Sequence, residues 1–306
     1  MLTRAVLLQL ADNKKMESFV RRNPISAPLV RRFIAGETLE EATEPVRALN
    51  ARGISVSLDF LGESVSNREE VAASVDTYLR VFQHIRCESL DANVSLKLTA
   101  LGLDLDPEMC YCNMLRLLSA AGPDLFIRID MESSAYTQRT LDLFARLWDG
   151  PEPHKNVGVV IQSYLYRSGE DVEKLIAMGA RVRLVKGAYK EPASVAYPAK
   201  ADVDRNFLAL MERLLLKGNY PAIATHDSKI IGTTKAFARE NKIAPDHFEF
   251  QMLYGIRRDL QSQLVNEGFR MRVYSPFGSH WYPYLMRRLA ERPANLWFVA
   301  KNLLKR

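Results

Sequence analysis

The amino-acid sequence predicts an α/β fold, a closed barrel of eight parallel strands alternating with helices. Three observations support this prediction. Eight short runs rich in apolar and β-branched residues recur along the chain, with longer amphipathic stretches between them. Most of these runs end in a polar residue. The length of 306 residues also suits one such domain, since barrels of this class commonly reach about 250 residues or more.

The eight expected strands cover residues 53–59, 94–99, 125–130, 157–162, 181–187, 222–227, 248–253 and 269–274. Helical patterns occur at 67–85, 107–119, 137–147, 202–216 and 228–240, and a further helix is expected at 38–50. We interpret residues 1–50 as a helical segment packed on the barrel and residues 51–306 as the barrel domain. Parallel strands joined through helices need right-handed crossovers, which eight such units close into a barrel.

Composition narrows the class of protein. A 47% apolar fraction supports a large core, and 25% charged residues is ordinary for a folded protein. The net charge of +6 comes without long blocks of Lys or Arg, so nucleic acid is not an expected partner. The three cysteines, Cys87, Cys110 and Cys112, form no disulfide framework. With no convincing signal peptide and no long apolar run, we expect a cytoplasmic protein.

A functional site is expected at the carboxyl-terminal rim of the strands, where barrels of this class carry their active sites. The polar residues at the strand ends are Asp59, Lys97, Asp130, Gln162, Lys186, His226, Asp227, Gln251 and Tyr274. The fifth strand adds Arg181 and Arg183 on one face. Lys186 and the flexible Gly187 follow at its end, where an anion could approach the backbone.

Other chemistries have weaker support. His226 and Asp227 suggest a metal-dependent barrel hydrolase as an alternative, but the chain has no His-x-His pair and no His-Glu-x-x-His motif. It has no Gly-x-Ser-x-Gly sequence for a serine nucleophile and no Gly-x-Gly-x-x-Gly sequence for a dinucleotide. No metal site is therefore predicted.

The segment after the last strand carries an unusual helical face. Tyr284, Arg287, Arg288 and Glu291 fall at i, i+3, i+4 and i+7. Two guanidiniums are costly to bring near a core unless an anion meets them. This face predicts a site for a small carboxylate.

Several motifs in order resemble the proline dehydrogenase family, which includes one domain of the bifunctional proline-utilisation proteins. They begin with residues 59–63, 95–99 and 129–132, and continue with Leu-Val-Lys-Gly-Ala-Tyr at 184–189 and Ala-Thr-His-Asp at 224–227. They end with Phe-Glu-Phe-Gln-Met-Leu-Tyr-Gly at 248–255 and Tyr-Leu-Met-Arg-Arg at 284–288. The resemblance runs from about residue 53 to 297 and is closest to the monofunctional bacterial enzymes. It implies a distorted (β/α)8 barrel whose last helix caps the mouth.

The resemblance also implies roles for individual residues. Arg287 and Arg288 would hold the proline carboxylate, Tyr274 and Tyr284 would wall the pocket, and Leu184 and Tyr189 would pack on the ring. Lys97 and Asp130 would form a paired support beneath substrate and flavin, so Lys97, Asp130 and Tyr274 are the expected catalytic residues. FAD would contact Asp130, Gln162, Arg183, Lys186, Gly187, Ala188, Thr225, His226, Gln251, Leu253 and Glu291. Glu63 would pair with Arg287 as a gate.

The implied reaction is oxidation of L-proline to Δ1-pyrroline-5-carboxylate by hydride transfer to FAD. Its implied partners are a membrane quinone as electron acceptor, reached by peripheral contact with the inner face of the cell membrane, and a downstream pyrroline-5-carboxylate dehydrogenase. A hydroxyproline dehydrogenase of the same fold is the nearest alternative. The chain departs from the bifunctional proteins in a shorter segment between Tyr274 and Tyr284, and in carrying Lys190 where they have an aromatic residue.

Overall fold

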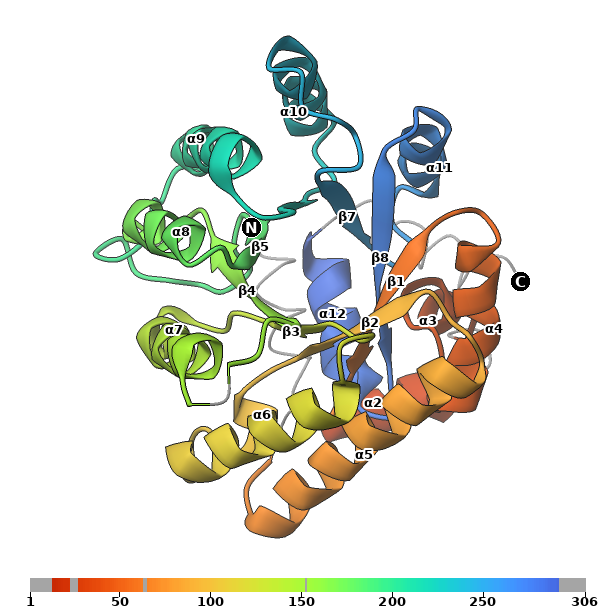
Figure 1. Cartoon of the computed structure of the whole chain (residues 1–306). Helices are drawn as coiled ribbons and strands as arrows, with labels where there is room; N and C mark the ends of the chain where they lie inside the picture. The colour runs from red at the N-terminus through yellow and green to blue at the C-terminus, as the bar shows by residue number, and fades with distance from the viewer. Residues whose placement is uncertain (1–12, 23–26, 63–64, 152, 292–306) are drawn as a thin grey trace.

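The computed structural model describes residues 13–22, 27–62, 65–151 and 153–291. Their strands form one closed parallel barrel in chain order, in which the last strand pairs with the first (Figure 1). The strands are β1 Ser55–Phe60, β2 Ala92–Leu96, β3 Ile127–Ile129, β4 Val157–Gln162, β5 Arg181–Val185, β6 Ala222–Ala224, β7 Glu249–Leu253 and β8 Arg270–Phe277. The predicted barrel is confirmed.

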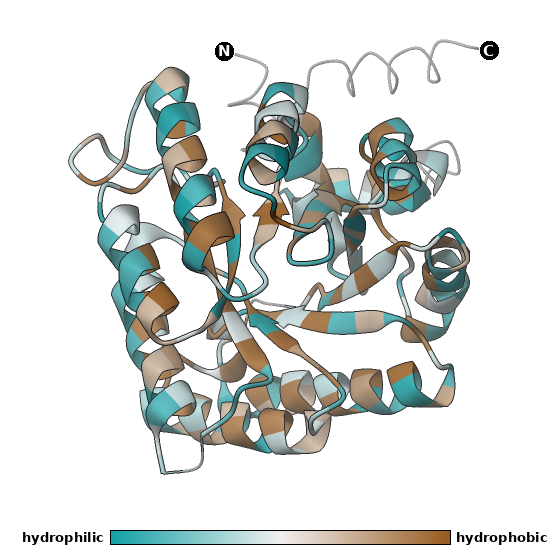
Figure 2. Cartoon of the chain, turned by 45° about the horizontal axis from the view of Figure 1, so that its top comes forward, coloured by the Kyte–Doolittle hydropathy of each residue, from teal (hydrophilic) through white to brown (hydrophobic). Residues whose placement is uncertain are grey.

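Helices surround this barrel (Figure 1). They are α2 Lys14–Arg22, α3 Ala27–Phe33, α4 Leu39–Asn50, α5 Arg68–Cys87, α6 Pro107–Ala121, α7 Ser134–Asp149, α8 Ser168–Ala177, α9 Lys200–Lys217, α10 Ser228–Glu240, α11 Arg258–Asn266 and α12 Trp281–Glu291, with the 3-10 helix η1 Thr99–Leu101. Apolar and polar residues alternate within the turns of the outer helices (Figure 2). None of the helices in these ranges is both long and apolar enough to cross a membrane.

Local sequence explains where two of these helices begin. Thr38 precedes α4, and its hydroxyl accepts a hydrogen bond from the Glu41 backbone N–H at 3.2 Å. Asn67 does the same for α5, accepting from the Glu70 N–H at 2.9 Å, while the Glu70 carboxylate accepts from the Ser66 N–H. Such caps satisfy backbone donors that the first turn leaves unpaired. The helices predicted from residues 38 and 67 therefore start where their capping residues indicate.

The interior of the barrel is polar. Arg183 reaches across it to the hydroxyls of Ser95 at 3.0 Å and Ser57 at 3.4 Å. Nearer the start of the strands, Arg272 contacts the Glu249 carboxylate at 3.0 Å. Barrels of this class are usually filled by branched apolar side chains. Here the main hydrophobic core lies between the strands and the surrounding helices, and hydrogen-bonded charges fill the inside.

The last helix lies over the carboxyl-terminal rim. Its residues Trp281, Tyr284 and Leu285 form a second hydrophobic cluster with Leu61, which follows β1, and Ile256, which follows β7. In Figure 1, α12 accordingly occupies the centre of the ring of strands. The predicted cap over the barrel mouth is confirmed, and α12 packs there through its apolar and aromatic residues, whereas Arg287 is exposed.

Some boundaries differ from the prediction. The third and sixth strands keep only residues 127–129 and 222–224, because the chain leaves the sheet early and forms rim loops. The eighth strand runs on to Phe277, where it still pairs with Phe60 of β1. Helices α8 and α11 were not singled out from the sequence, and neither has a side-chain hydrogen bond at its N-cap.

Candidate active site

Four charged residues from neighbouring strands alternate in sign across the rim. Lys97, after β2, lies between Asp59 of β1 at 3.4 Å and Asp130, after β3, at 3.9 Å. Arg183 of β5 contacts the other oxygen of Asp130 at 2.6 Å. These side chains are at most 12% exposed. Because each charge faces an opposite one, the free-energy cost of burying these side chains is reduced.

Asp130 also receives a neutral donor. The Tyr274 hydroxyl donates to Asp130 Oδ2 at 2.8 Å, while Arg183 occupies Oδ1. The Arg183 guanidinium carbon lies 5.4 Å from the centre of the Tyr274 ring. The expected catalytic residues Lys97, Asp130 and Tyr274 are thus brought together around one carboxylate, with Arg183 as a fourth member.

A second charged group follows β5 and β6. The Lys186 ammonium lies 2.5 Å from Asp204 and 3.0 Å from Asp227, and Lys200 also pairs with Asp204. Burial raises the pKa of Asp227, but the Lys186 contact outweighs it and holds that pKa below its ordinary value. The charge of Lys186, expected to face the cofactor, is therefore already shared between two carboxylates.

Gly187 is required by the backbone after β5. Its φ is +116°, and a Cβ there would lie 2.6 Å from the ring of Tyr164. Only glycine fits both the angle and the space. The expected approach of an anion to this backbone stays a prediction. Ala188 and Tyr189 follow on the exposed surface, and Tyr189 is 41% exposed.

The strand ends β4, β6 and β7 contribute polar groups to the same rim. The Gln162 amide donates to the Glu132 carbonyl at 2.9 Å, whereas the Gln251 amide donates to Glu249, which lies nearer the start of the strands. The Leu253 N–H donates to His226 Nε2 at 2.9 Å, so a neutral His226 ring carries its proton on Nδ1. Thr225 is buried beside it and accepts from the Asp227 N–H at 3.1 Å.

The expected carboxylate clamp lies on α12. Tyr284 is buried, and Arg288 is half-buried with its guanidinium carbon 5.1 Å from the Tyr284 ring centre. Arg287 is exposed. Glu291 is the last residue of α12. One helix thus carries both arginines, but in different surroundings.

Leu184, expected to pack on the ring, lies apart from this group. Leu184 has no exposed surface and belongs to the main hydrophobic core. Glu63, expected to gate Arg287, falls outside the described residues. Groups of three or more His, Cys, Asp or Glu residues arranged to hold a metal ion do not occur in the described ranges.

The donors at the rim fit a flavin nucleotide. Arg183 is buried, and its Nε has no hydrogen-bond partner among the residues that the structure describes. Gln162 and Thr225 are buried polar residues at the same rim. Buried donors favour an electron-rich ring system above them, because an unmatched polar group is costly.

Sequence reasoning missed the small polar floor of the site. Ser57 and Ser95 hydrogen-bond to one another at 2.8 Å and to Arg183. Glu132 accepts a hydrogen bond from the Thr99 hydroxyl at 2.8 Å, as well as one at its carbonyl from Gln162. Ser57 stands two residues before Asp59, and Ser95 two residues before Lys97. Residues two apart in a strand share a face, and this spacing is the signal that could have found them.

Comparisons with known proteins agree on one family. The model of a family described as proline dehydrogenase matches residues 42–301. The chain is 42% identical over 304 residues to proline dehydrogenase 1 of Bacillus subtilis subsp. natto, covering 99% of each. It is 41% identical over 308 residues to proline dehydrogenase of Deinococcus radiodurans, covering 99% of this chain and 98% of the relative.

Longer proteins match over part of their length. The chain is 31% identical to the bifunctional protein PutA of Escherichia coli strain K12, covering 87% of this chain and 23% of that protein. The crystal structure of proline utilization A from Bdellovibrio bacteriovorus, inactivated by N-propargylglycine, superposes with a TM-score of 0.83 at 26% identity. That match covers 99% of this chain and 38% of the other.

Proposed function

This chain belongs to the proline dehydrogenase family, and we propose that it oxidises L-proline to Δ1-pyrroline-5-carboxylate with bound FAD. One structural observation carries the proposal beyond the family. Helix α12, which bears Arg287 and Arg288, lies over a rim where Lys97, Asp130, Arg183 and Tyr274 converge. A cationic helix above a buried charged floor suits a small zwitterion held between them.

Proline would bind with its carboxylate on Arg287 and Arg288. Guanidiniums hold a carboxylate in two-pronged contacts that fix its orientation as well as its charge. Tyr284, already packed beside Arg288, would form one wall, and Tyr274 the other. Tyr189 would close over the ring from its exposed loop. Leu184, which is fully buried in the main hydrophobic core, would pack beneath this pocket.

FAD would lie across the rim. The residues that would hold it are Asp130, Gln162, Arg183, Lys186, Gly187, Ala188, Thr225, His226, Gln251, Leu253 and Glu291. When bound, the flavin would supply the acceptor for the hydride that leaves the ring carbon next to the proline nitrogen. The approach of phosphate to Lys186 would compete with Asp204 and Asp227 for that ammonium.

The protein's own part in the reaction would be orientation and exclusion of water. Asp130 would be held in place by the Arg183 guanidinium and the Tyr274 hydroxyl. Lys97 would be held at the floor by Asp59 and Asp130. The proline amine must lose a proton before its lone pair can assist hydride departure. We further propose that Glu63 pairs with Arg287 until proline displaces it.

The electrons would pass to a membrane quinone through peripheral contact with the inner face of the cell membrane. The product would pass to a pyrroline-5-carboxylate dehydrogenase. Both partners are suggested by the family resemblance.

A visible absorption spectrum of the purified protein tests the proposal. Oxidised flavin bands that bleach when proline is added under anaerobic conditions would support it. A colourless protein that binds zinc stoichiometrically would overturn it in favour of the barrel-hydrolase alternative. Adding trans-4-hydroxyproline in a parallel sample compares the alternative substrate of the same fold.

A further inference from the structure

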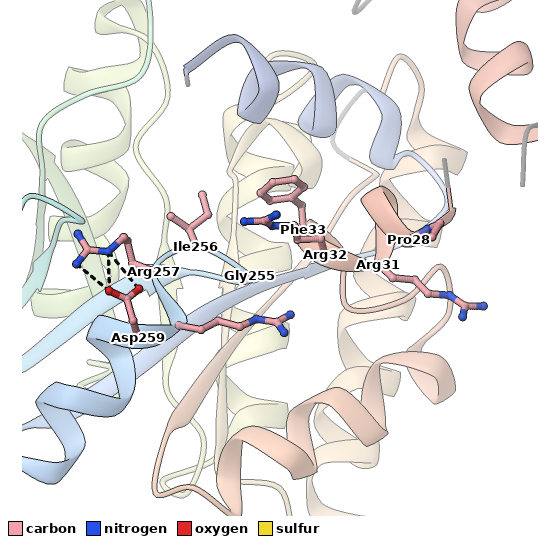
Figure 3. A pocket seen from close by; sticks show the side chains of 9 residues that line it. Pro28, Arg31, Arg32, Phe33, Gly255, Ile256, Arg257 and Asp259 are labelled. Carbon is pink, nitrogen blue, oxygen red and sulfur yellow. Dashed lines mark hydrogen bonds and ion pairs between the residues drawn. The ribbon is translucent and has the colours of Figure 1, made fainter. Parts of the chain in front are cut away.

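A pocket of about 580 Å³ lies between α3 and the loop that joins β7 to α11 (Figure 3). Its lining is rich in arginine: Pro28, Arg31, Arg32, Phe33, Gly255, Ile256, Arg257, Arg258 and Asp259. None of these residues has a role in holding proline or FAD as proposed above. The pocket therefore needs an explanation of its own.

The β7–α11 loop packs closely against the backbone of α3. Gly255 has a φ of +73°, and a Cβ there would lie 1.6 Å from the Arg32 carbonyl oxygen. Two residues later, Arg257 has a φ of +53°, which non-glycine residues adopt rarely. Such conformations concentrate at functional sites, because the surrounding structure must hold them there. The same close approach brings the arginines of α3 beside those of the loop.

The lining carries an excess of positive charge. Among the described residues, the lining holds four arginines and one aspartate. Asp259 is already engaged by Arg257, with Nη2 to Oδ2 at 3.0 Å, and Figure 3 shows those two side chains turned toward each other. Arg31 and Arg258 are exposed. The N-terminal end of α11, whose N-cap Arg257 makes no side-chain cap hydrogen bond, adds a partial positive charge.

We propose that this pocket binds a phosphate-bearing ligand. Guanidiniums pair with phosphate oxygens in two-pronged contacts, and a helix N-terminus favours the same charge. Pro28, Phe33 and Ile256 offer apolar surface to the carbon part of such a ligand. The volume lies within the usual range for small-ligand sites. The phosphate could belong to a lipid headgroup or to a free phosphate compound, since both present the same group.

Binding of a ligand in this pocket would also affect α12. Phe33 and Ile256 line the pocket and also belong to the hydrophobic cluster beneath Tyr284 and Leu285. A ligand that contacts both α3 and the β7–α11 loop would therefore stabilise the hydrophobic cluster against which α12 packs.

The first test measures binding of inorganic phosphate by calorimetry to the full chain and to the double variant Arg31→Gln/Arg258→Gln. Both residues are exposed, so little packing is lost. We expect saturable binding in the wild type and at least about tenfold weaker binding in the variant. The matched control is Arg116→Gln/Arg205→Gln, which removes the same charge from exposed positions on α6 and α9. Equal weakening in the control, or no saturable binding in the wild type, would overturn the proposal.

A second variant guards against misfolding as the cause of lost binding. Asp259→Asn removes the one competing carboxylate from the lining and should strengthen phosphate binding by a few-fold. Unchanged or weaker binding in Asp259→Asn, in a protein with the wild-type melting temperature, would count against the proposal.

Sedimentation with vesicles distinguishes the two sources of phosphate. Vesicles of phosphatidylcholine with phosphatidylglycerol are compared with phosphatidylcholine alone. Retention on the anionic vesicles that falls in Arg31→Gln/Arg258→Gln but not in the control assigns the pocket to a lipid headgroup. Loss of inorganic phosphate binding with unchanged vesicle retention assigns it to a soluble phosphate compound.

Discussion

At the scale of single residues, Asp130 organises the candidate site. It receives Arg183 on one oxygen and the Tyr274 hydroxyl on the other, and Lys97 lies 3.9 Å away. Sequence reasoning identified all four residues because each stands at or near a strand end. It missed Ser57 and Ser95, because their position two residues before Asp59 and Lys97, which puts them on the same strand faces, was not used.

We predict that Tyr274→Phe lowers kcat/KM for proline by about tenfold, because Asp130 loses a donor that orients it, and lowers the free energy of unfolding by about 1 kcal/mol. Steady-state kinetics with a dye acceptor and urea unfolding measure the two effects. Tyr220→Phe is the control. The Tyr220 hydroxyl donates to Glu249 at 3.3 Å near the opposite end of the barrel, so that variant should lose stability alone. Equal kinetic losses in both variants would contradict the assignment.

For the carboxylate clamp, we expect Arg287→Lys and Arg288→Lys each to raise the KM for proline by about tenfold or more, since lysine cannot make the two-pronged contact. Arg205→Lys on α9 preserves charge in the same way at an exposed position and should leave KM unchanged. Wild-type proline kinetics in both α12 variants would contradict the proposal that Arg287 and Arg288 bind the proline carboxylate.

The three thiols should differ in reactivity. Cys110 is buried, and burial raises its pKa to about 12, whereas Cys87 and Cys112 are exposed. Because the thiolate is the reactive form, an aromatic disulfide reagent at mildly alkaline pH should modify Cys87 and Cys112 in the folded protein. Cys110 should react only after unfolding. Rapid modification of all three thiols in the native state would show that the α6 core opens easily.

At the scale of elements, local signals predicted most of the barrel. Periodic apolar runs gave all eight strands, and capping residues marked the starts of α4 and α5. Helices α8 and α11 carry no such mark, since arginine occupies both N-caps and its side chain makes no capping hydrogen bond to the helix backbone. Their positions are set by packing on the barrel, which a local pattern does not contain.

A packing defect under α12 should change the KM for proline, whereas the same defect elsewhere in the core should change only the stability of the protein. Leu285 is buried in the second cluster, so Leu285→Ala leaves a cavity under α12 and should raise the KM for proline several-fold. Leu175→Ala on α8 makes the same change in the main core and should lower stability by about 2–5 kcal/mol without altering KM. Proline kinetics and urea unfolding of both variants give the comparison. A wild-type KM in Leu285→Ala would contradict the role of this cluster in positioning α12.

At the scale of the whole molecule, charged side chains inside the barrel connect strands that are far apart in the sequence, including the first and the last. Arg272 of β8 contacts Glu249 of β7 and donates to the Val56 carbonyl of β1 at 2.8 Å, so it spans the seam where the last strand meets the first. Arg183 links β5 to β1 and β2. Sequence could not predict these contacts, because they depend on the register of strands far apart in the chain.

This interior makes stability sensitive to acid through Glu249. Burial alone would raise its pKa, but the Arg272 guanidinium, together with the Gln251 hydrogen bond and the charge of Arg128, outweighs burial, and the folded-state pKa lies below the ordinary 4.5. The folded state therefore binds the proton less readily than the unfolded state, so this stabilisation is complete above about pH 4.5 and declines as pH falls through the folded-state pKa. We predict that Glu249→Gln costs roughly 3–5 kcal/mol at neutral pH, because it leaves Arg272 without its counterion. Urea unfolding at a series of pH values should show the gap between variant and wild type narrowing as acid protonates Glu249. A gap that stays constant to the lowest pH at which the protein folds would mean that the ion pair does not carry this stability.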